Sequence, residues 1–104
     1  VPEDALPWQP ARIVDISGGG LRLNQRTNIE RNEVVKVKFM VSIVGEILQF
    51  NLFARILSST PVHGRSDMFE QRMEFLKITQ DERDKIVRFI FESERMEIAN
   101  GKRS

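Results

Sequence analysis

The feature that most constrains this 104-residue chain is the alternation of apolar and polar side chains over residues 48–56. Successive side chains of a β-strand point to opposite faces, so the alternation predicts a strand with one buried face. Burial of that face would contribute roughly 1.5–3 kcal/mol for each large side chain. The apolar face consists of Leu48, Phe50, Leu52, Ala54 and Ile56, and the polar face includes Gln49, Asn51 and Arg55.

Four more segments fit the same period and are predicted as strands, namely residues 9–16, 21–23, 34–44 and 68–78. The third is rich in β-branched residues, which favour the extended conformation. In the first, regular alternation predicts Ile13 and Asp15 on one face and Val14 on the other. In the last, it predicts Gln71 and Arg72 on opposite faces.

The stretches between these strands are polar and contain turn-forming residues. Residues 24–33 are predicted as a connection, Gly45 with Glu46 as a tight turn, and residues 58–67 as a loop. The glycine run at 18–20 is predicted to end the first strand, since glycines permit backbone angles that are closed to other residues. The loop contains His63, the single histidine of a chain that has no cysteine. Disulfides and thiolate chemistry are therefore excluded, and no metal site is expected.

After residue 78 the period changes, and a helix over residues 80–98 is predicted to pack on the sheet. Residues 79–82 have the form of a capping box, in which Thr79 and Glu82 satisfy free amides at the start of a helix. Asp81 and Lys85 are spaced to form an ion pair along the helix. The apolar stripe that should contact the sheet comprises Ile86, Phe89, Ile90 and Met96.

Short strands with no helices between them argue for an antiparallel sheet or barrel in a mainly β protein. The length fits one domain. Residues 1–10, with three prolines, are predicted to be a linker or loop, residues 11–98 the β-barrel domain with its helix at about 80–98, and residues 99–104 a frayed tail. No apolar run approaches the ~20 residues that span a membrane. We therefore expect no membrane insertion and a cytoplasmic location.

The stretch from residue 15 to residue 23 carries the side chains of a candidate ligand site. The Asp15 carboxylate offers acceptors for the N–H donors of a guanine edge, while Ser17 and Arg22 can donate to phosphate. The glycines let backbone amides approach a ligand closely. On these residues alone, a hairpin turn capped by Asp15 and Ser17 is the stronger interpretation. The candidate ligand-binding residues are Asp15, Ser17, Gly18, Gly19, Gly20 and Arg22.

No catalytic set accompanies this stretch, and an enzyme is not expected. Nucleophilic catalysis needs an activated nucleophile beside a base, and Ser17 has no histidine near it in the sequence. The phosphate-binding fingerprints of nucleotide enzymes are also missing, because the glycine run opens a strand and not a helix. The net charge is +1, so the chain as a whole is not a polyanion binder and DNA is not an expected partner.

The pattern Asp15-x-Ser17-x-x-Gly20 resembles the (Asp/Asn)-x-Ser-x-x-Gly signature of PilZ domains, and it lies at the end of a predicted strand as in that family. Residues 75–78 and 82–91 resemble the family's last strand and closing helix, especially those of flagellar-brake-type PilZ proteins. The similarity runs from about residue 9 to about residue 92. It implies a PilZ-type β-barrel that binds cyclic di-GMP, with Asp15 and Ser17 on a guanine and its adjacent phosphate.

Two features depart from the PilZ pattern. Members that bind cyclic di-GMP usually carry an Arg-x-x-x-Arg motif ahead of their first strand, but Arg12 is the only arginine before Asp15. Residues 1–10 are also a poor candidate for the family's first strand, so that strand is expected to be missing. Either the chain begins inside a longer protein, or its earlier residues were left out or disordered. The second departure is Arg72, which stands where the family often has glycine. It could contact a ligand, although a solvated strand arginine is the favoured interpretation.

Three functions are consistent with these patterns. The leading one is a cyclic di-GMP receptor domain that needs no cofactor and signals to a protein partner, with a flagellar motor component as the candidate. The second is a PilZ-type adaptor that works through protein contacts and does not bind nucleotide. The third is a small barrel that binds single-stranded nucleic acid. It ranks last, because Trp8 is the only aromatic residue outside the predicted strands and helix.

Overall fold

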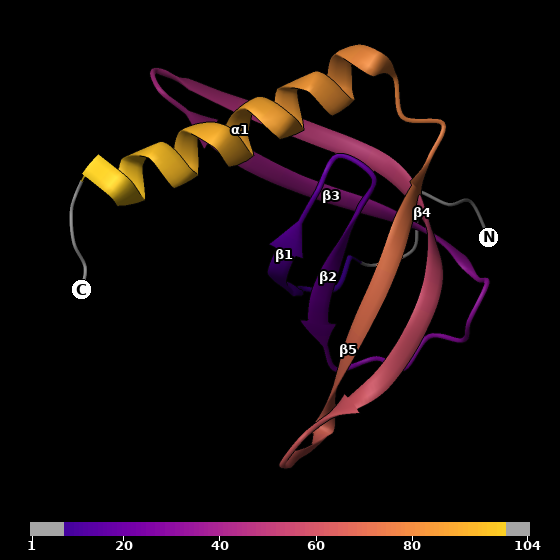
Figure 1. Cartoon of the computed structure of the whole chain (residues 1–104). Helices are drawn as coiled ribbons and strands as arrows, with labels where there is room; N and C mark the ends of the chain where they lie inside the picture. Colours follow the sequence, from indigo (N-terminus) through magenta and orange to yellow (C-terminus); the bar gives the residue numbers. More distant parts are fainter. Residues whose placement is uncertain (1–7, 100–104) are drawn as a thin grey trace.

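The protein is a curled antiparallel sheet with one helix lying across it, as a computed structural model shows (Figure 1). The structure describes residues 8–99, with side chains described as far as residue 93. The strands lie in the order β1-β2-β5-β4-β3, so β1 and β3 form the two edges of a half-barrel. The predicted mainly β class with a C-terminal helix is confirmed. The elements are β1 (Arg12–Ile16), β2 (Gly20–Gln25), β3 (Val34–Ile43), β4 (Glu46–Val62), β5 (Arg65–Leu76) and α1 (Gln80–Ala99).

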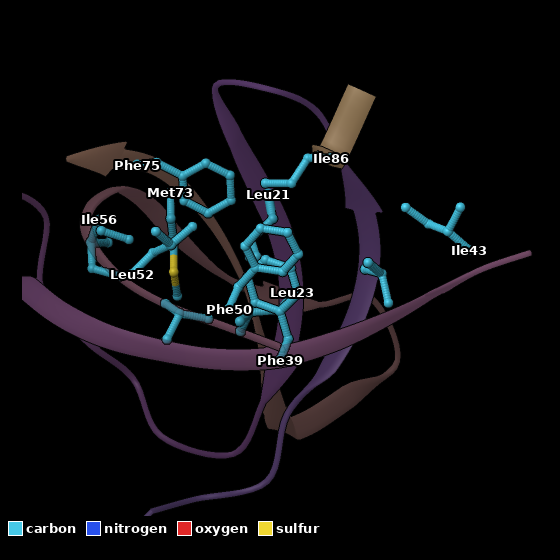
Figure 2. Close-up of a cluster of buried hydrophobic side chains, with 13 residues drawn as sticks. Leu21, Leu23, Phe39, Ile43, Phe50, Leu52, Ile56, Met73, Phe75 and Ile86 are labelled. Carbon is cyan, nitrogen blue, oxygen red and sulfur yellow. The ribbon is translucent and has the colours of Figure 1, made fainter. Parts of the chain in front are cut away.

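The core lies on the inner side of the curl, where aromatic rings from three strands meet (Figure 2). The ring of Phe39 in β3 lies 5.2 Å from that of Phe50 in β4 and 6.2 Å from that of Phe75 in β5, measured between centroids. The inner face predicted for residues 48–56 is confirmed, because its members belong to this cluster or pack against it. The buried members are Leu21, Leu23, Val37, Phe39, Val41, Ile43, Phe50, Leu52, Ala54, Ile56, Met73, Phe75 and Ile86.

The polar residues between β4 and β5 form a two-stranded ribbon, and the prediction of a loop at 58–67 is wrong. β4 continues to Val62 and β5 begins at Arg65, so only His63 and Gly64 lie in the turn. Gly64 has a φ of 81°, which glycine adopts without steric cost. Backbone hydrogen bonds hold such a ribbon together whatever its side chains are, and polar composition therefore did not reveal it. Next to the turn, a hydrogen bond from Arg65 Nε (3.3 Å) holds the pKa of the Asp67 carboxyl below its ordinary value.

The capping box predicted at residues 79–82 is confirmed, and it fixes where α1 begins. The Thr79 N–H donates to Glu82 Oε1 at 3.0 Å, and the Glu82 N–H donates to Thr79 Oγ1 at 3.1 Å. The ion pair predicted between Asp81 and Lys85 is also present, with an N–O distance of 3.0 Å. Local side-chain chemistry thus starts the helix at the predicted position.

The apolar stripe predicted on the helix is confirmed in its first part. Ile86 is fully buried, and Phe89 and Ile90 pack against the core cluster beside β3. The side chain of Met96 lies outside the described residues, as do residues 1–7 of the predicted linker and residues 100–104 of the predicted tail. In the part of the chain that is described, no helix has the length and apolar character needed to cross a membrane.

Removal of the cap should weaken the fold measurably. We expect Thr79→Ala to lower the free energy of unfolding by about 1 kcal/mol, because the Thr79 hydroxyl no longer accepts from the Glu82 N–H or donates to Glu82 Oε1. Urea denaturation followed by circular dichroism would measure the difference. Thr79→Ser keeps the hydroxyl and is the matched control. An equal loss in both variants would mean that the capping bonds are not the cause.

Candidate functional site

A shallow cavity of about 240 Å³ lies where β1, β2, β5 and β4 run side by side, next to the turn between β1 and β2. It contains most of the ligand-binding residues that the sequence predicts. Gly18 is the exception, because it does not line the cavity. The predicted residues that do line it are Asp15, Ser17, Gly19, Gly20 and Arg22.

Asp15 reaches this cavity because of a β-bulge in β1. Ile13 pairs with Leu23 of β2, but Asp15 pairs with the adjacent Arg22, so Val14 has no cross-strand partner. An extra residue of this kind breaks the alternation of side chains along a strand. The prediction that Ile13 and Asp15 share a face is therefore wrong. Ile13 lies on the inner side with Leu23, and Asp15 lies on the outer side with Arg22.

The Asp15 carboxylate is held only loosely by the protein itself. Its Oδ2 atom lies 3.7 Å from Nη2 of Arg22, whose Nη1 atom lies 3.8 Å from Oε1 of Glu70. The side chains of Asp15 and Arg22 are 68% and 41% exposed. Ion pairs of this kind contribute about 0–1 kcal/mol, so a ligand can replace them at little cost. Both groups are therefore available as an acceptor and a donor.

Ser17 shapes the turn that follows. Its N–H donates to the Gly20 carbonyl at 2.8 Å, and its hydroxyl donates to the same oxygen and accepts from the Gly19 N–H, both at 3.3 Å. The Gly19 carbonyl accepts from the Phe75 N–H at 2.9 Å, which ties the turn to β5. The interpretation of Ser17 as a residue that caps the turn is thus confirmed. Asp15, in contrast, pairs across the sheet with Arg22.

Space, and not backbone angle, explains the glycines of this turn. The glycine run separates β1 from β2 as predicted, but the positive φ angles among described glycines belong to Gly45 and Gly64, so the turn does not use the angles that glycine alone permits. A Cβ atom on Gly20 would lie 2.0 Å from the Met73 carbonyl oxygen of β5. One on Gly18 would lie 3.1 Å from Arg83 Cγ in α1, whereas one on Gly19 would have nothing within 4 Å. The turn is therefore wedged between β5 and the helix.

The cavity also contains side chains that the sequence did not assign to it. Arg72 and Glu74 of β5 line it, and so does Leu57. Leu57 is the extra residue of a second bulge, since Ile56 pairs with Met73 and Ser58 with Arg72. Alternation predicts Arg72 on the outer face, but only the pairing of β5 with β2 brings it to this site. Among the side chains of residues 8–93, no group of three or more His, Asp or Glu could hold a metal ion.

Comparison with known proteins identifies a family. The family model of the PilZ domain matches residues 2–92, which covers the sheet and most of the helix. No curated protein and no solved structure matches the chain. The match includes all of the residues that line the cavity.

Proposed function

Because this chain belongs to the PilZ domain family, whose members are receptors and effectors for cyclic di-GMP, we propose that it is a cyclic di-GMP receptor domain. The observation that carries the proposal is the bulge at Val14, which places Asp15 beside Arg22 at the cavity. A hydrogen-bond acceptor for guanine and a hydrogen-bond donor for phosphate are thereby adjacent on one surface. PilZ domains are binding or adaptor domains and not enzymes, so binding is the activity to test.

In this proposal, each group of the site has a role that its chemistry supports. The Asp15 carboxylate accepts hydrogen bonds from the N–H donors of one guanine. The Ser17 hydroxyl, which makes only long bonds within the turn, donates to the adjacent phosphate. Arg22 leaves its loose partners to bind a phosphate oxygen, because charge-assisted bonds to phosphate are stronger than exposed ion pairs. The open space at Gly19 lets the ligand approach the backbone.

We further propose that the domain acts in the cytoplasm on a protein partner, with a flagellar motor component as the candidate. The resemblance of residues 75–78 and 82–91 to flagellar-brake-type PilZ proteins supports this choice of partner. The packing of the turn supports a signalling role. Gly18 faces Arg83 and Val87, so a shift of the turn on ligand binding would press on α1. The helix could then carry the signal to the partner's surface.

The Asp15 carboxylate should be essential for binding. We expect Asp15→Ala to weaken cyclic di-GMP binding about 10- to 100-fold, because a guanine edge loses its charged acceptor. Calorimetric titration would measure this, on this chain and also on a longer chain if the gene encodes residues ahead of Val1. Asp67→Ala is the matched control, since Asp67 is an exposed aspartate at the far end of the ribbon.

Two results would contradict the receptor proposal. One is the absence of cyclic di-GMP binding by the folded protein, and the other is equal affinity in Asp15→Ala and the unchanged protein. The first result would favour an adaptor that works without nucleotide. One observation supports that second candidate, since several apolar side chains near the turn between β3 and β4 are exposed to solvent. Met40, Val44 and Ile47 are 67%, 76% and 73% exposed there.

A further inference from the structure

Arg72 belongs to a row of charged side chains that crosses the sheet. Asp15 of β1 pairs with Arg22 of β2, Arg22 pairs with Arg72 of β5, and Arg72 pairs with Ser58 of β4. Side chains of directly paired residues lie on the same face. Adjacent strands are about 4.8 Å apart, so Arg72 lies roughly 10 Å across the cavity from Asp15. The two arginines are therefore side by side, with the carboxylate at one end of the row.

The charges around the cavity leave Arg72 as its unbalanced group. Arg22 is shared by Asp15 and Glu70, at 3.7 Å and 3.8 Å. Glu74 accepts a hydrogen bond from Arg55 at 3.0 Å. Among the described residues, no carboxylate lies within ion-pair distance of Arg72. Arg72 is an exposed residue that pairs directly with Arg22, an arrangement of like charges that disfavours folding.

The bulge in β4 gives Arg72 an apolar neighbour. Leu57 has no cross-strand partner in β5, is partly exposed, and lines the same cavity as Arg72. An apolar side chain next to an ion excludes water and strengthens the attraction between that ion and an anionic ligand. On the side of the cavity away from Asp15, the planar cation of Arg72 thus lies beside the apolar side chain of Leu57.

We propose that Arg72 binds the phosphodiester of the dinucleotide, so that one phosphate lies between Arg72 and Arg22 while a guanine lies on Asp15. The inference rests on the proposed function of this site. It assigns a ligand contact to β5, and it replaces the interpretation of Arg72 as a solvated strand arginine. A phosphate relieves the repulsion between the two arginines, and a guanidinium matches the geometry of phosphate oxygens.

Calorimetric titration of cyclic di-GMP into the Arg72→Gln protein tests the proposal. We expect its affinity to fall about tenfold or more, and to depend less on NaCl concentration than that of the unchanged protein. Arg65→Gln is the matched control, because it removes the same charge from the same strand about 23 Å away. Arg72→Lys keeps the charge but loses the planar fork, and should bind with intermediate affinity. Urea denaturation would establish that each variant is folded.

The possible failures are distinguishable. Equal or tighter binding by Arg72→Gln would overturn this assignment while the receptor proposal stands, and Arg72 would then be a bystander or an obstruction. Weaker binding with an unchanged salt dependence would also overturn it, since the contact would not be ionic. If the unchanged protein does not bind cyclic di-GMP, the receptor proposal fails and the role of Arg72 falls with it.

Discussion

Replacing Gly20 with alanine should destabilise the protein by about 4 kcal/mol or more, since the added methyl group would collide with backbone. Its Cβ atom would lie 2.0 Å from the Met73 carbonyl oxygen and 3.1 Å from the Glu74 Cα atom. These atoms belong to β5, which pairs with β2 on one side and β4 on the other. The clash can be relieved only by separating β2 from β5. Domains of this size have about 5–15 kcal/mol of stability, so most of it would be lost.

The neighbouring glycine offers a control for this prediction. A Cβ atom on Gly19 would meet nothing within 4 Å, so Gly19→Ala should change the free energy of unfolding by less than about 0.5 kcal/mol. Urea denaturation of the two variants would measure the contrast. Similar destabilisation in both would show that the close approach of β2 to β5 is not what requires glycine. If the contrast is found, Gly20 has a structural role, and loss of binding in its variants would follow from unfolding.

The sheet could be predicted largely from the sequence because its core strands alternate strictly. The inner face of residues 48–56 and the helix start at residues 79–82 are both set by neighbouring side chains, and both were predicted correctly. The outer half of the β4–β5 ribbon was not, because its exposed side chains carry no apolar period. In that part of the ribbon the strands are held by backbone hydrogen bonds, which leave no apolar alternation in the sequence.

The candidate site shows the same limit more sharply. Two bulges build it, at Val14 and at Leu57, and both are apolar residues of a kind that also occurs in regular strands, so residue type does not mark them. Regular alternation consequently placed Asp15 on the wrong face. The neighbourhood of Arg22 and Arg72 depends on the register of strands that are far apart in the sequence. The motif could thus be located from the sequence, but the cavity around it required the three-dimensional pairing.

A buried glutamine supports the sheet behind this site, and its removal should be the second most damaging change. Gln71 is fully buried on the inner face of β5. Its Nε2 atom donates to the Thr27 carbonyl at 2.7 Å and to Ser59 Oγ at 3.1 Å, and its Oε1 atom accepts from Gln25 Nε2. Ser59 in turn donates to Asn28 Oδ1 at 2.8 Å. One amide therefore holds β2, the turn after it and β4 together.

Gln71→Ala should lower the free energy of unfolding by about 3 kcal/mol, because it leaves a cavity and strips buried polar groups of their partner. Gln49→Ala is the matched control, since Gln49 is exposed on β4 and should matter by less than about 0.5 kcal/mol. Gln71→Met separates the two causes. It keeps nearly the same volume and loses every hydrogen bond, so its expected cost is about 1–3 kcal/mol. A Gln71→Met protein as stable as the unchanged one would mean that packing alone makes Gln71 important. In that case core packing, and not the hydrogen bonds of Gln71, would fix the position of the neighbouring Arg72.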